Sequence, residues 1–325
     1  MQDCSGCVLC GACAKLEPMP RSPLIEACAL AAELGSPALV LLDCRFDLAS
    51  PEAGAHAFAA GHIPGARYAH LDRNLSGPVT ASSGRHPLPD PAQLRAWLGS
   101  LGVAPGVRVI AYDEANAAFA ARAWWLLRWV GHEDVAVLDG GLRAWLAAGG
   151  VLEAGEATRP PALAPRVSPS AASTPPPSAS PAPALPLPAR NSAQAPATVD
   201  AEAVLRACAD ASRLIVDARA PERFAGELEP IDAIAGHVPG AVNHPFQSNL
   251  TVDGCFLPPP ELARRWHQRL GDRPPQDVIM MCGSGVTACQ NLLALEVAGM
   301  PGARLYAGSW SEWIRDPGRP VARGR

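Results

Sequence analysis

One cysteine of the chain stands where nucleophilic chemistry could take place. Cys282 follows the apolar run VIMM, which predicts a buried strand, and the helical pattern TACQNLLALEVAG begins a few residues later. Ligands bind at the carboxyl ends of parallel strands, because the strand-to-helix turn presents backbone N–H groups and the positive end of the helix dipole. Cys282 is therefore the first candidate for a catalytic residue.

The loop after Cys282 could stabilise a negative charge on its sulfur. It has no bulky side chain, so successive backbone N–H groups can curl around one point as an anion-binding nest. A thiolate at that point would be stabilised and would act as a nucleophile at neutral pH. The residues that would form this binding loop are Gly283, Ser284, Gly285, Val286 and Thr287.

Three other interpretations of this loop remain open. The run GSGVTA fits the dinucleotide pattern G-x-G-x-x-G/A, but the next strand region, ARLYAGSW, lacks the acidic residue that such sites use. A cysteine phosphatase would need an arginine six positions after the cysteine to bind the phosphoryl group, and Ala288 stands there. Cys282 could also be an inert buried cysteine, although a Gly-x-Gly turn would make a poor core.

Four more cysteines lie at the N-terminus, at uniform CxxC spacing. Such pairs can bring thiolates onto one zinc ion or iron–sulfur cluster, but no second Cys/His pair lies close in the sequence. The alternative is that residues 1–21 form a disordered tail, with Met19 as the true start of the protein. The four candidate ligands are Cys4, Cys7, Cys10 and Cys13.

Composition indicates a chain with two domains and no nucleic-acid partner. A length of 325 residues suits two cores of ordinary size, and the net charge of −4 comes without a long Lys/Arg run that could neutralise phosphates. No stretch reaches the roughly 18 apolar residues of a membrane span, and the N-terminus lacks secretory-signal features. We expect a cytoplasmic protein whose cysteines are thiols, metal ligands or catalysts rather than disulfides.

A proline-rich segment separates two similar halves. Between Pro160 and Pro196 the chain carries 12 of its 35 prolines, mixed with Ala and Ser. Such a segment buries too little apolar surface to offset the entropy of ordering, and proline removes backbone donors. Residues 153–197 are therefore predicted to be a disordered linker.

The two halves repeat each other in four blocks of the same order. The paired blocks are LVLLDCRFD and LIVDARAPE, AGHIPGA and AGHVPGA, VRVIAYDEANAAFAARAWWLLRWVG and DVIMMCGSGVTACQNLLALEVAG, and LDGGLRAW and YAGSWSEW. This pattern indicates an internal duplication. It aligns Asp113 with Cys282, so a nucleophile stands in one half only.

Short apolar runs alternate with helical patterns in both halves, which predicts α/β domains with parallel sheets flanked by helices. The expected strands are 39–42, 107–112, 135–138, 213–216, 277–281 and 304–306, and the expected helices are 91–101, 117–130, 260–270 and 287–298. Because only the second half has the cysteine, residues 22–152 are predicted to be an inactive domain. Residues 198–325 are predicted to be the catalytic one.

With these motifs in view, the chain resembles the two-domain rhodanese family of sulfurtransferases. The resemblance rests on CGSGVTA and GSWSEW, on the twin GHIPGA and GHVPGA blocks, and on LLDCRFD and AARAWWLLRWVGHEDVAVLDGGLRAW. It extends from about residue 24 to the C-terminus, apart from the linker. It implies tandem rhodanese-like domains with the active site between them.

The resemblance also implies a two-step reaction. Cys282 would take a sulfane sulfur from 3-mercaptopyruvate or thiosulfate as a persulfide. It would then pass the sulfur to cyanide or to a thiol such as thioredoxin or a low-molecular-weight thiol. No organic cofactor is expected. The alternative is a non-enzymatic persulfide carrier or sulfur-relay sensor.

The loop sequence is similar to that of the 3-mercaptopyruvate branch, and this similarity carries roles to further residues. Ser284 matches a loop serine that relays a proton, Asp72 the acid of that relay, and His86 its imidazole. Arg223 matches an arginine that binds the substrate carboxylate. The chain departs from the pattern at Ile231, where a second carboxylate-binding arginine would stand.

Overall fold

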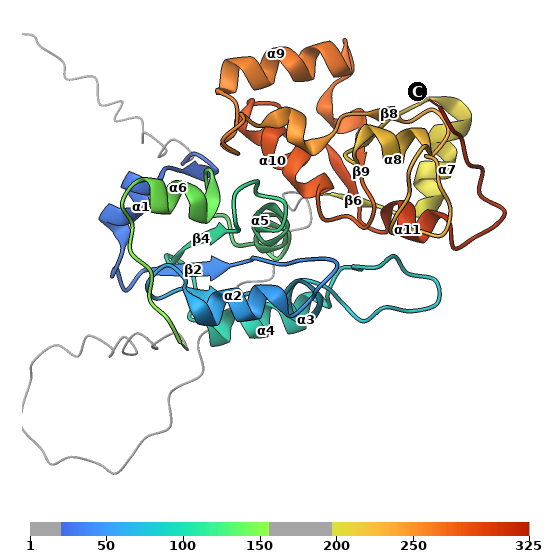
Figure 1. Cartoon of the computed structure of the whole chain (residues 1–325). Helices are drawn as coiled ribbons and strands as arrows, with labels where there is room; N and C mark the ends of the chain where they lie inside the picture. Colours follow the sequence, from blue (N-terminus) through green and yellow to red (C-terminus); the bar gives the residue numbers. More distant parts are fainter. Residues whose placement is uncertain (1–20, 156–196, 325) are drawn as a thin grey trace, which may run out of the picture.

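The computed structural model describes residues 21–155 and 197–324. These residues form two α/β halves, coloured blue to green and yellow to red in Figure 1. The CxxC cysteines and nearly all of the predicted tail and linker lie outside the described residues.

Each half is built on a five-stranded sheet in which every strand pair is parallel. The first sheet has the order β1-β5-β4-β2-β3, and the second has the corresponding order β6-β10-β9-β7-β8. The strands of the first sheet are β1 (Leu24–Ile25), β2 (Leu39–Asp43), β3 (Arg67–Tyr68), β4 (Arg108–Tyr112) and β5 (Val135–Leu138). Those of the second are β6 (Thr198–Val199), β7 (Leu214–Asp217), β8 (Val242–Asn243), β9 (Val278–Met281) and β10 (Arg304–Tyr306).

Helices flank both sheets, which confirms the predicted α/β class. The first half contains α1 (Ala27–Glu33), α2 (Ala53–Ala60), α3 (Leu71–Asn74), α4 (Pro91–Ser100), α5 (Ala120–Trp129) and α6 (Gly141–Ala147). The second half contains α7 (Ala201–Asp210), α8 (Pro221–Ala225), η1 (Phe246–Asn249), α9 (Pro259–Leu270), η2 (Pro275–Asp277), α10 (Ala288–Val297) and α11 (Ser309–Trp313).

The amphipathic helix α9 shows how local sequence sets these elements. Leu262, Trp266 and Leu270 recur every four residues and are buried on one face. Arg264 and Arg265 point outward and pair with Glu261 on the same helix. The helix therefore covers the core with one face and is solvated on the other.

The duplication repeats contacts as well as topology. Arg45 donates to Asp43 at the end of β2, and Arg219 donates to Asp217 at the end of β7. Each guanidinium also donates at 2.7 Å to a glycine carbonyl, 16 residues on in the first half and 17 in the second. These buried ion pairs fix the carboxyl ends of β2 and β7. In their sheets these strands lie next to β4 and β9, which precede Asp113 and Cys282.

The two halves pack against each other through α5 and α10, which lie at the centre of Figure 1. One hydrophobic cluster runs through both halves and includes Trp124 and Leu292. Arg128 on α5 and Glu296 on α10 form an ion pair at 2.7 Å. The loop between α3 and α4, residues 75–90, extends from the first half toward the second (Figure 1). The interface therefore brings residues of both halves to the loop after β9.

Candidate active site

Cys282 lies at the carboxyl end of β9 and is 2% exposed. Its N–H donates to Ser309 Oγ at 3.0 Å, and its carbonyl accepts from the Trp310 N–H at 3.0 Å. The sulfur accepts a hydrogen bond from the Gly285 N–H at 3.2 Å. We expected several N–H groups around the sulfur, and Gly285 is the one donor to it in the part of the chain that the structure describes.

Gly285 must be glycine for two reasons. Its φ is +75°, in the left-handed region that side chains disfavour. A Cβ on this residue would also lie 2.3 Å from the Ala307 carbonyl oxygen. The turn that brings its N–H to the sulfur therefore depends on the missing side chain.

In the first half, the loop that corresponds to the Cys282 loop hydrogen-bonds the side chain of its own first residue, Asp113. Asp113 follows β4 as Cys282 follows β9, and its two oxygens accept N–H donors from Ala117, Phe119 and Ala120 at 2.9–3.1 Å. Burial raises the pKa of Asp113, and these backbone hydrogen bonds oppose the rise. The duplicated loop thus surrounds its first side chain with backbone N–H donors, and in the first half that side chain is a carboxyl and not a thiol.

The structure brings the three predicted relay residues together across the interface. His86 Nδ1 lies 2.7 Å from Ser284 Oγ, and His86 Nε2 lies 3.3 Å from Asp72 Oδ1. Burial lowers the pKa of His86 to about 3, and the nearby Arg122 and Arg85 guanidiniums add to the effect. The imidazole is therefore neutral at pH 7.

The partners of His86 assign its tautomer. The Asp72 carboxylate can only accept, so its position 3.3 Å from Nε2 favours the tautomer that carries the proton on Nε2. Nδ1 is then the acceptor, and the Ser284 hydroxyl donates to it. Asp72 and His86 come from the first half and Ser284 from the second. A hydrogen bond between the two halves thus holds the hydroxyl of Ser284, two residues after Cys282.

Arg122, on α5, supports this arrangement, and we did not predict it. The side chain is fully buried. It donates to the Gly285 carbonyl at 3.2 Å and to the His86 carbonyl at 3.2 Å, so it ties the cysteine loop to the relay loop. The signal in the sequence is one arginine among the apolar residues of AARAWWLL, a place where a charge needs buried partners.

Arg223, the predicted carboxylate-binding residue, lies on α8 beside the cysteine loop. Its Nε and Nη2 donate to Glu229 at 3.0 and 2.7 Å, and its Nη2 donates to Asp232 at 3.0 Å. A Cβ on Gly283 would lie 3.5 Å from both Nη1 and Nη2 of Arg223. The guanidinium therefore faces the residue next to Cys282.

The other predicted loop residues have mainly structural contacts. Val286 is buried in the hydrophobic cluster shared by the halves, and Thr287 precedes α10 without a side-chain cap. Cys289, the second residue of α10, is fully buried, and its thiol donates to the Gly285 carbonyl. Burial raises the pKa of Cys289 to about 12, so this thiol stays protonated at neutral pH.

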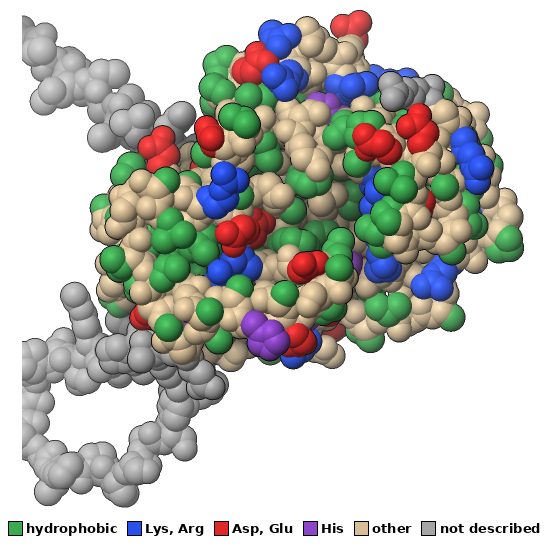
Figure 2. Space-filling view, in the orientation of Figure 1, with side chains coloured by type: hydrophobic (Ala, Val, Ile, Leu, Met, Phe, Trp, Pro, Cys, Tyr) green, Lys and Arg blue, Asp and Glu red, His purple; other side chains and the backbone are tan. Residues whose placement is uncertain are grey.

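The described residues show neither a candidate metal centre nor a candidate membrane span. Within residues 21–155 and 197–324, no three His, Cys, Asp or Glu side chains form a group that could hold a metal ion. No helix in the same ranges has the length and apolarity to cross a membrane. Charged side chains of both signs are interspersed over the face shown in Figure 2.

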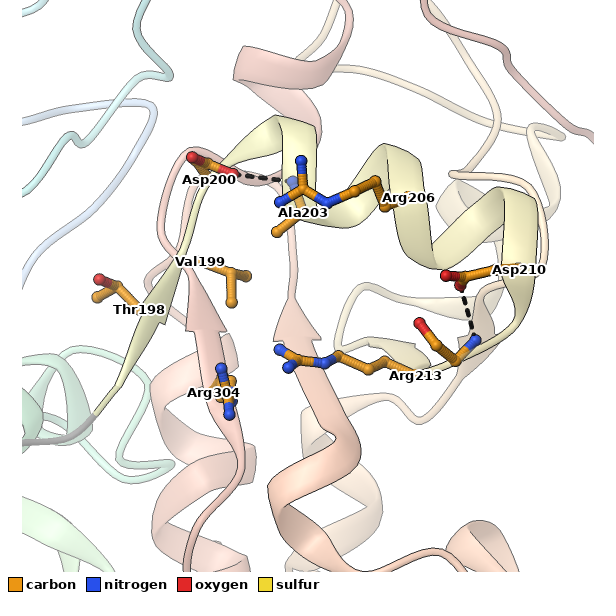
Figure 3. Close-up of a pocket in the computed structure, with 9 residues that line it drawn as sticks. Thr198, Val199, Asp200, Ala203, Arg206, Asp210, Arg213 and Arg304 are labelled. Atoms are coloured by element: carbon orange, nitrogen blue, oxygen red, sulfur yellow. Dashed lines mark hydrogen bonds between the residues drawn. The ribbon is translucent and has the colours of Figure 1, made fainter.

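A pocket at the edge strand of the second sheet is separate from Cys282. Arg206, Arg213 and Arg304 line it, together with residues of β6 and α7 (Figure 3). Its two carboxylates are engaged locally, since Asp200 accepts from the Ala203 N–H and Asp210 from the Ser212 N–H. None of the relay residues lines this pocket.

Comparisons with known proteins identify relatives over nearly the whole chain. Residues 26–148 and 200–316 each match the family described as the rhodanese-like domain. A Pseudomonas aeruginosa protein named "Probable 3-mercaptopyruvate sulfurtransferase" is 46% identical over 308 residues, covering 94% of this chain and 100% of that protein. A Mycobacterium tuberculosis protein named "Putative thiosulfate sulfurtransferase SseB" is 39% identical over 312 residues, covering 93% and 97%.

A solved structure gives the same result for the fold. The structure titled "3-mercaptopyruvate sulfurtransferase from Leishmania major" superposes with a TM-score of 0.73 at 30% identity. The superposition covers 90% of this chain and 75% of the other.

Proposed function

The chain belongs to the rhodanese family of sulfurtransferases, and from this premise we propose that it transfers sulfur from 3-mercaptopyruvate through a persulfide on Cys282. In this proposal the first half is inactive and the second carries the nucleophile. The observation that supports it most is that Ser284, two residues after Cys282, has its Oγ 2.7 Å from His86 Nδ1, while His86 Nε2 lies 3.3 Å from Asp72 Oδ1.

In the first step, the Cys282 thiolate attacks the sulfur of the donor. An S–S bond forms and the carbon–sulfur bond breaks, and the electron pair of that bond passes to the methylene carbon. The carbon takes up the proton that the donor thiol loses, which gives pyruvate and the persulfide anion. Ser284 and neutral His86 can carry this proton, because they form a donor–acceptor chain next to the reacting sulfur.

In the second step, the acceptor attacks the outer sulfur of the persulfide. Cyanide yields thiocyanate, a thiol yields its persulfide, and the Cys282 thiolate is regenerated in both cases. We propose reduced thiols, thioredoxin among them, as the acceptors. The cytoplasm, where thiols stay reduced, is the proposed compartment.

Three features support 3-mercaptopyruvate over thiosulfate as the donor. Thiosulfate releases sulfite without needing a proton on carbon, so the relay would have no role with that donor. The residues directly after Cys282 are small and uncharged rather than basic. Arg223 beside Gly283 supplies a cation for the donor carboxylate.

The test is single-turnover reaction with 3-mercaptopyruvate followed by intact-protein mass spectrometry. The wild type should gain the mass of one sulfur atom and release one pyruvate, and Cys282→Ser should do neither. Cys289→Ser is the matched control, because that buried thiol should not take up sulfur. A persulfide on Cys289, or full turnover by Cys282→Ser, would refute the mechanism.

The rival function is a persulfide carrier that delivers sulfur only to a protein partner. Rapid multiple turnover with cyanide or dithiothreitol distinguishes the two functions, because a carrier would release its sulfur once and stop. We expect sustained turnover with both small acceptors.

A further inference from the structure

Resemblance to the 3-mercaptopyruvate branch predicts a second carboxylate-binding arginine at position 231, and this chain has none there. Ile231 stands there, 43% exposed, and its N–H donates to Glu229 Oε1 at 3.1 Å. A hydrocarbon side chain cannot hydrogen-bond a carboxylate. Arg223 is then the one cation that the second half itself directs at Gly283 among the described residues.

A second arginine near Gly283 comes from the first half. Arg85 lies on the loop between α3 and α4, which reaches toward the second half (Figure 1). Its N–H donates to Ser311 Oγ at 3.1 Å. The preceding Gly84 lies against the Gly308 carbonyl so closely that a Cβ would be 2.5 Å from its oxygen. The backbone of Arg85 is thus fixed against the segment that supports Cys282.

The Arg85 guanidinium lies between Asp232 and the cysteine loop. Its Nη1 pairs with Asp232, the residue after Ile231. Its Nη2 points at the cysteine loop, since a Cβ on Gly283 would lie 2.9 Å from it. The same Cβ would lie 3.5 Å from both terminal nitrogens of Arg223. Two guanidiniums from different halves therefore converge within a few ångströms of one point beside the nucleophile.

Asp232 orients both arginines without using all their donors. It accepts from Nη1 of Arg85 and from Nη2 of Arg223. Nη2 of Arg85 and Nη1 of Arg223 face Gly283. The Nε of Arg85 is buried and has no hydrogen-bond partner within the described part of the chain. A buried donor without a partner is unfavourable, so it marks a place where an acceptor is expected.

We propose that Arg85 is a substrate-binding residue that binds the carboxylate of a 2-oxo acid donor jointly with Arg223. It takes the place of an arginine at position 231. The proposal rests on the proposed function, because it assigns the partner of the donor's carboxylate. It makes the first half, which lacks a nucleophile, a contributor to donor selection.

The test compares two donors that differ only in the carboxylate. These are 3-mercaptopyruvate and 1-mercaptopropan-2-one, the same mercaptoketone with a methyl group in place of the carboxylate. In Arg85→Gln, kcat/KM for 3-mercaptopyruvate should fall by about 10- to 100-fold more than kcat/KM for the ketone, mainly through KM. Equal losses for the two donors would overturn the proposal, because they would mean that Arg85 only holds the halves together.

Arg128→Gln is the matched control for that structural role. It removes the ion pair with Glu296, which joins the two halves through α5 and α10, and leaves Asp232 and both guanidiniums at Gly283. The preference for 3-mercaptopyruvate over the ketone should persist in this variant. If Arg128→Gln loses the preference as fully as Arg85→Gln, contacts between the halves are what matter and the proposal is wrong.

A binding measurement separates this inference from the proposed function. Pyruvate carries the same carboxylate, and its affinity for the Cys282→Ser protein can be measured by calorimetry without turnover. Arg85→Gln in that background should weaken pyruvate binding about 10-fold or more. Arg85-dependent pyruvate binding without 3-mercaptopyruvate turnover would refute the proposed function alone, and turnover with Arg85-independent binding would refute this inference alone.

Discussion

The hydrogen bond between Ser284 and His86 joins the two halves two residues after Cys282. Because His86 is buried and neutral, its Nδ1 can accept a hydrogen bond from the serine hydroxyl at any pH near neutrality. A neutral histidine that is held by a carboxylate and accepts from a hydroxyl is a common arrangement for proton transfer. Here its two sides come from different halves of a duplicated chain.

Replacing Ser284 should separate the two donors. In Ser284→Ala, kcat with 3-mercaptopyruvate should fall about 100-fold, the usual contribution of a positioned acid–base group. With thiosulfate it should change less than about threefold, because sulfite leaves without needing a proton on carbon. Steady-state kinetics with both donors measures this. A similar loss with both donors would mean that the serine supports the loop and does not move a proton.

The sequence predicted the residues of this chain of contacts but missed two of their neighbours. Cys282 could be predicted because a small-residue loop after a buried strand has a direct physical meaning. The roles of Ser284, His86 and Asp72 came from family resemblance, and the structure shows them in contact. Arg122 and Arg85 were missed because their contacts span the interface between the halves, which local patterns do not describe.

The loop between β9 and α10 depends on its glycines to different degrees. Gly285 has a left-handed backbone and a carbonyl oxygen in contact, whereas Gly283 faces only the ends of two flexible arginine side chains. A side chain at position 285 would clash with backbone atoms, which cannot easily move. A side chain at position 283 would meet arginine side chains, which can move. The structural requirement for glycine is therefore stronger at 285.

Substituting Gly285 should test that requirement. Gly285→Ala should lower the free energy of unfolding by about 2 kcal/mol or more, since it combines an unfavourable φ with a backbone clash. Urea denaturation followed by tryptophan fluorescence measures the change. Gly99→Ala on α4 is the control, because a Cβ there meets nothing within 4 Å and alanine favours a helix. Equal stability of the Gly285→Ala protein and the wild type would contradict this account of the turn.

The longer secondary-structure elements could be predicted from periodicity, and the shorter ones could not. The strand expected at 135–138 was found as predicted, and the helix expected at 91–101 spans Pro91–Ser100, with Asp90 accepting from the Ala92 and Gln93 N–H groups. The strands β1, β3, β6 and β8 have two residues each. Two residues carry no alternation, and such strands form only because a neighbouring strand offers backbone partners.

Buried histidines make the stability of the folded protein depend on pH. His86, His132 and His244 are all buried, and burial lowers the pKa of each. In the unfolded chain they would titrate near 6.5. Between that value and the lower pKa of the folded state, the unfolded chain binds more protons, so stability falls as pH falls.

His244 gives the sharpest test of this linkage, because burial lowers its pKa to about 4 and it lies away from the relay residues, against Trp266 and Asn249. Its contribution to stability is complete above pH 6.5 and is lost as pH falls toward 4. The loss should approach about 1.4 kcal/mol per pH unit for one histidine. In His244→Asn, the free energy of unfolding should therefore decrease less steeply than in the wild type between pH 6.5 and 4.5.

Urea denaturation at half-unit pH intervals gives both slopes. Identical slopes would mean that His244 takes up its proton in the folded protein as readily as in the unfolded chain. Water would then reach this side chain more easily than its burial in the structure indicates.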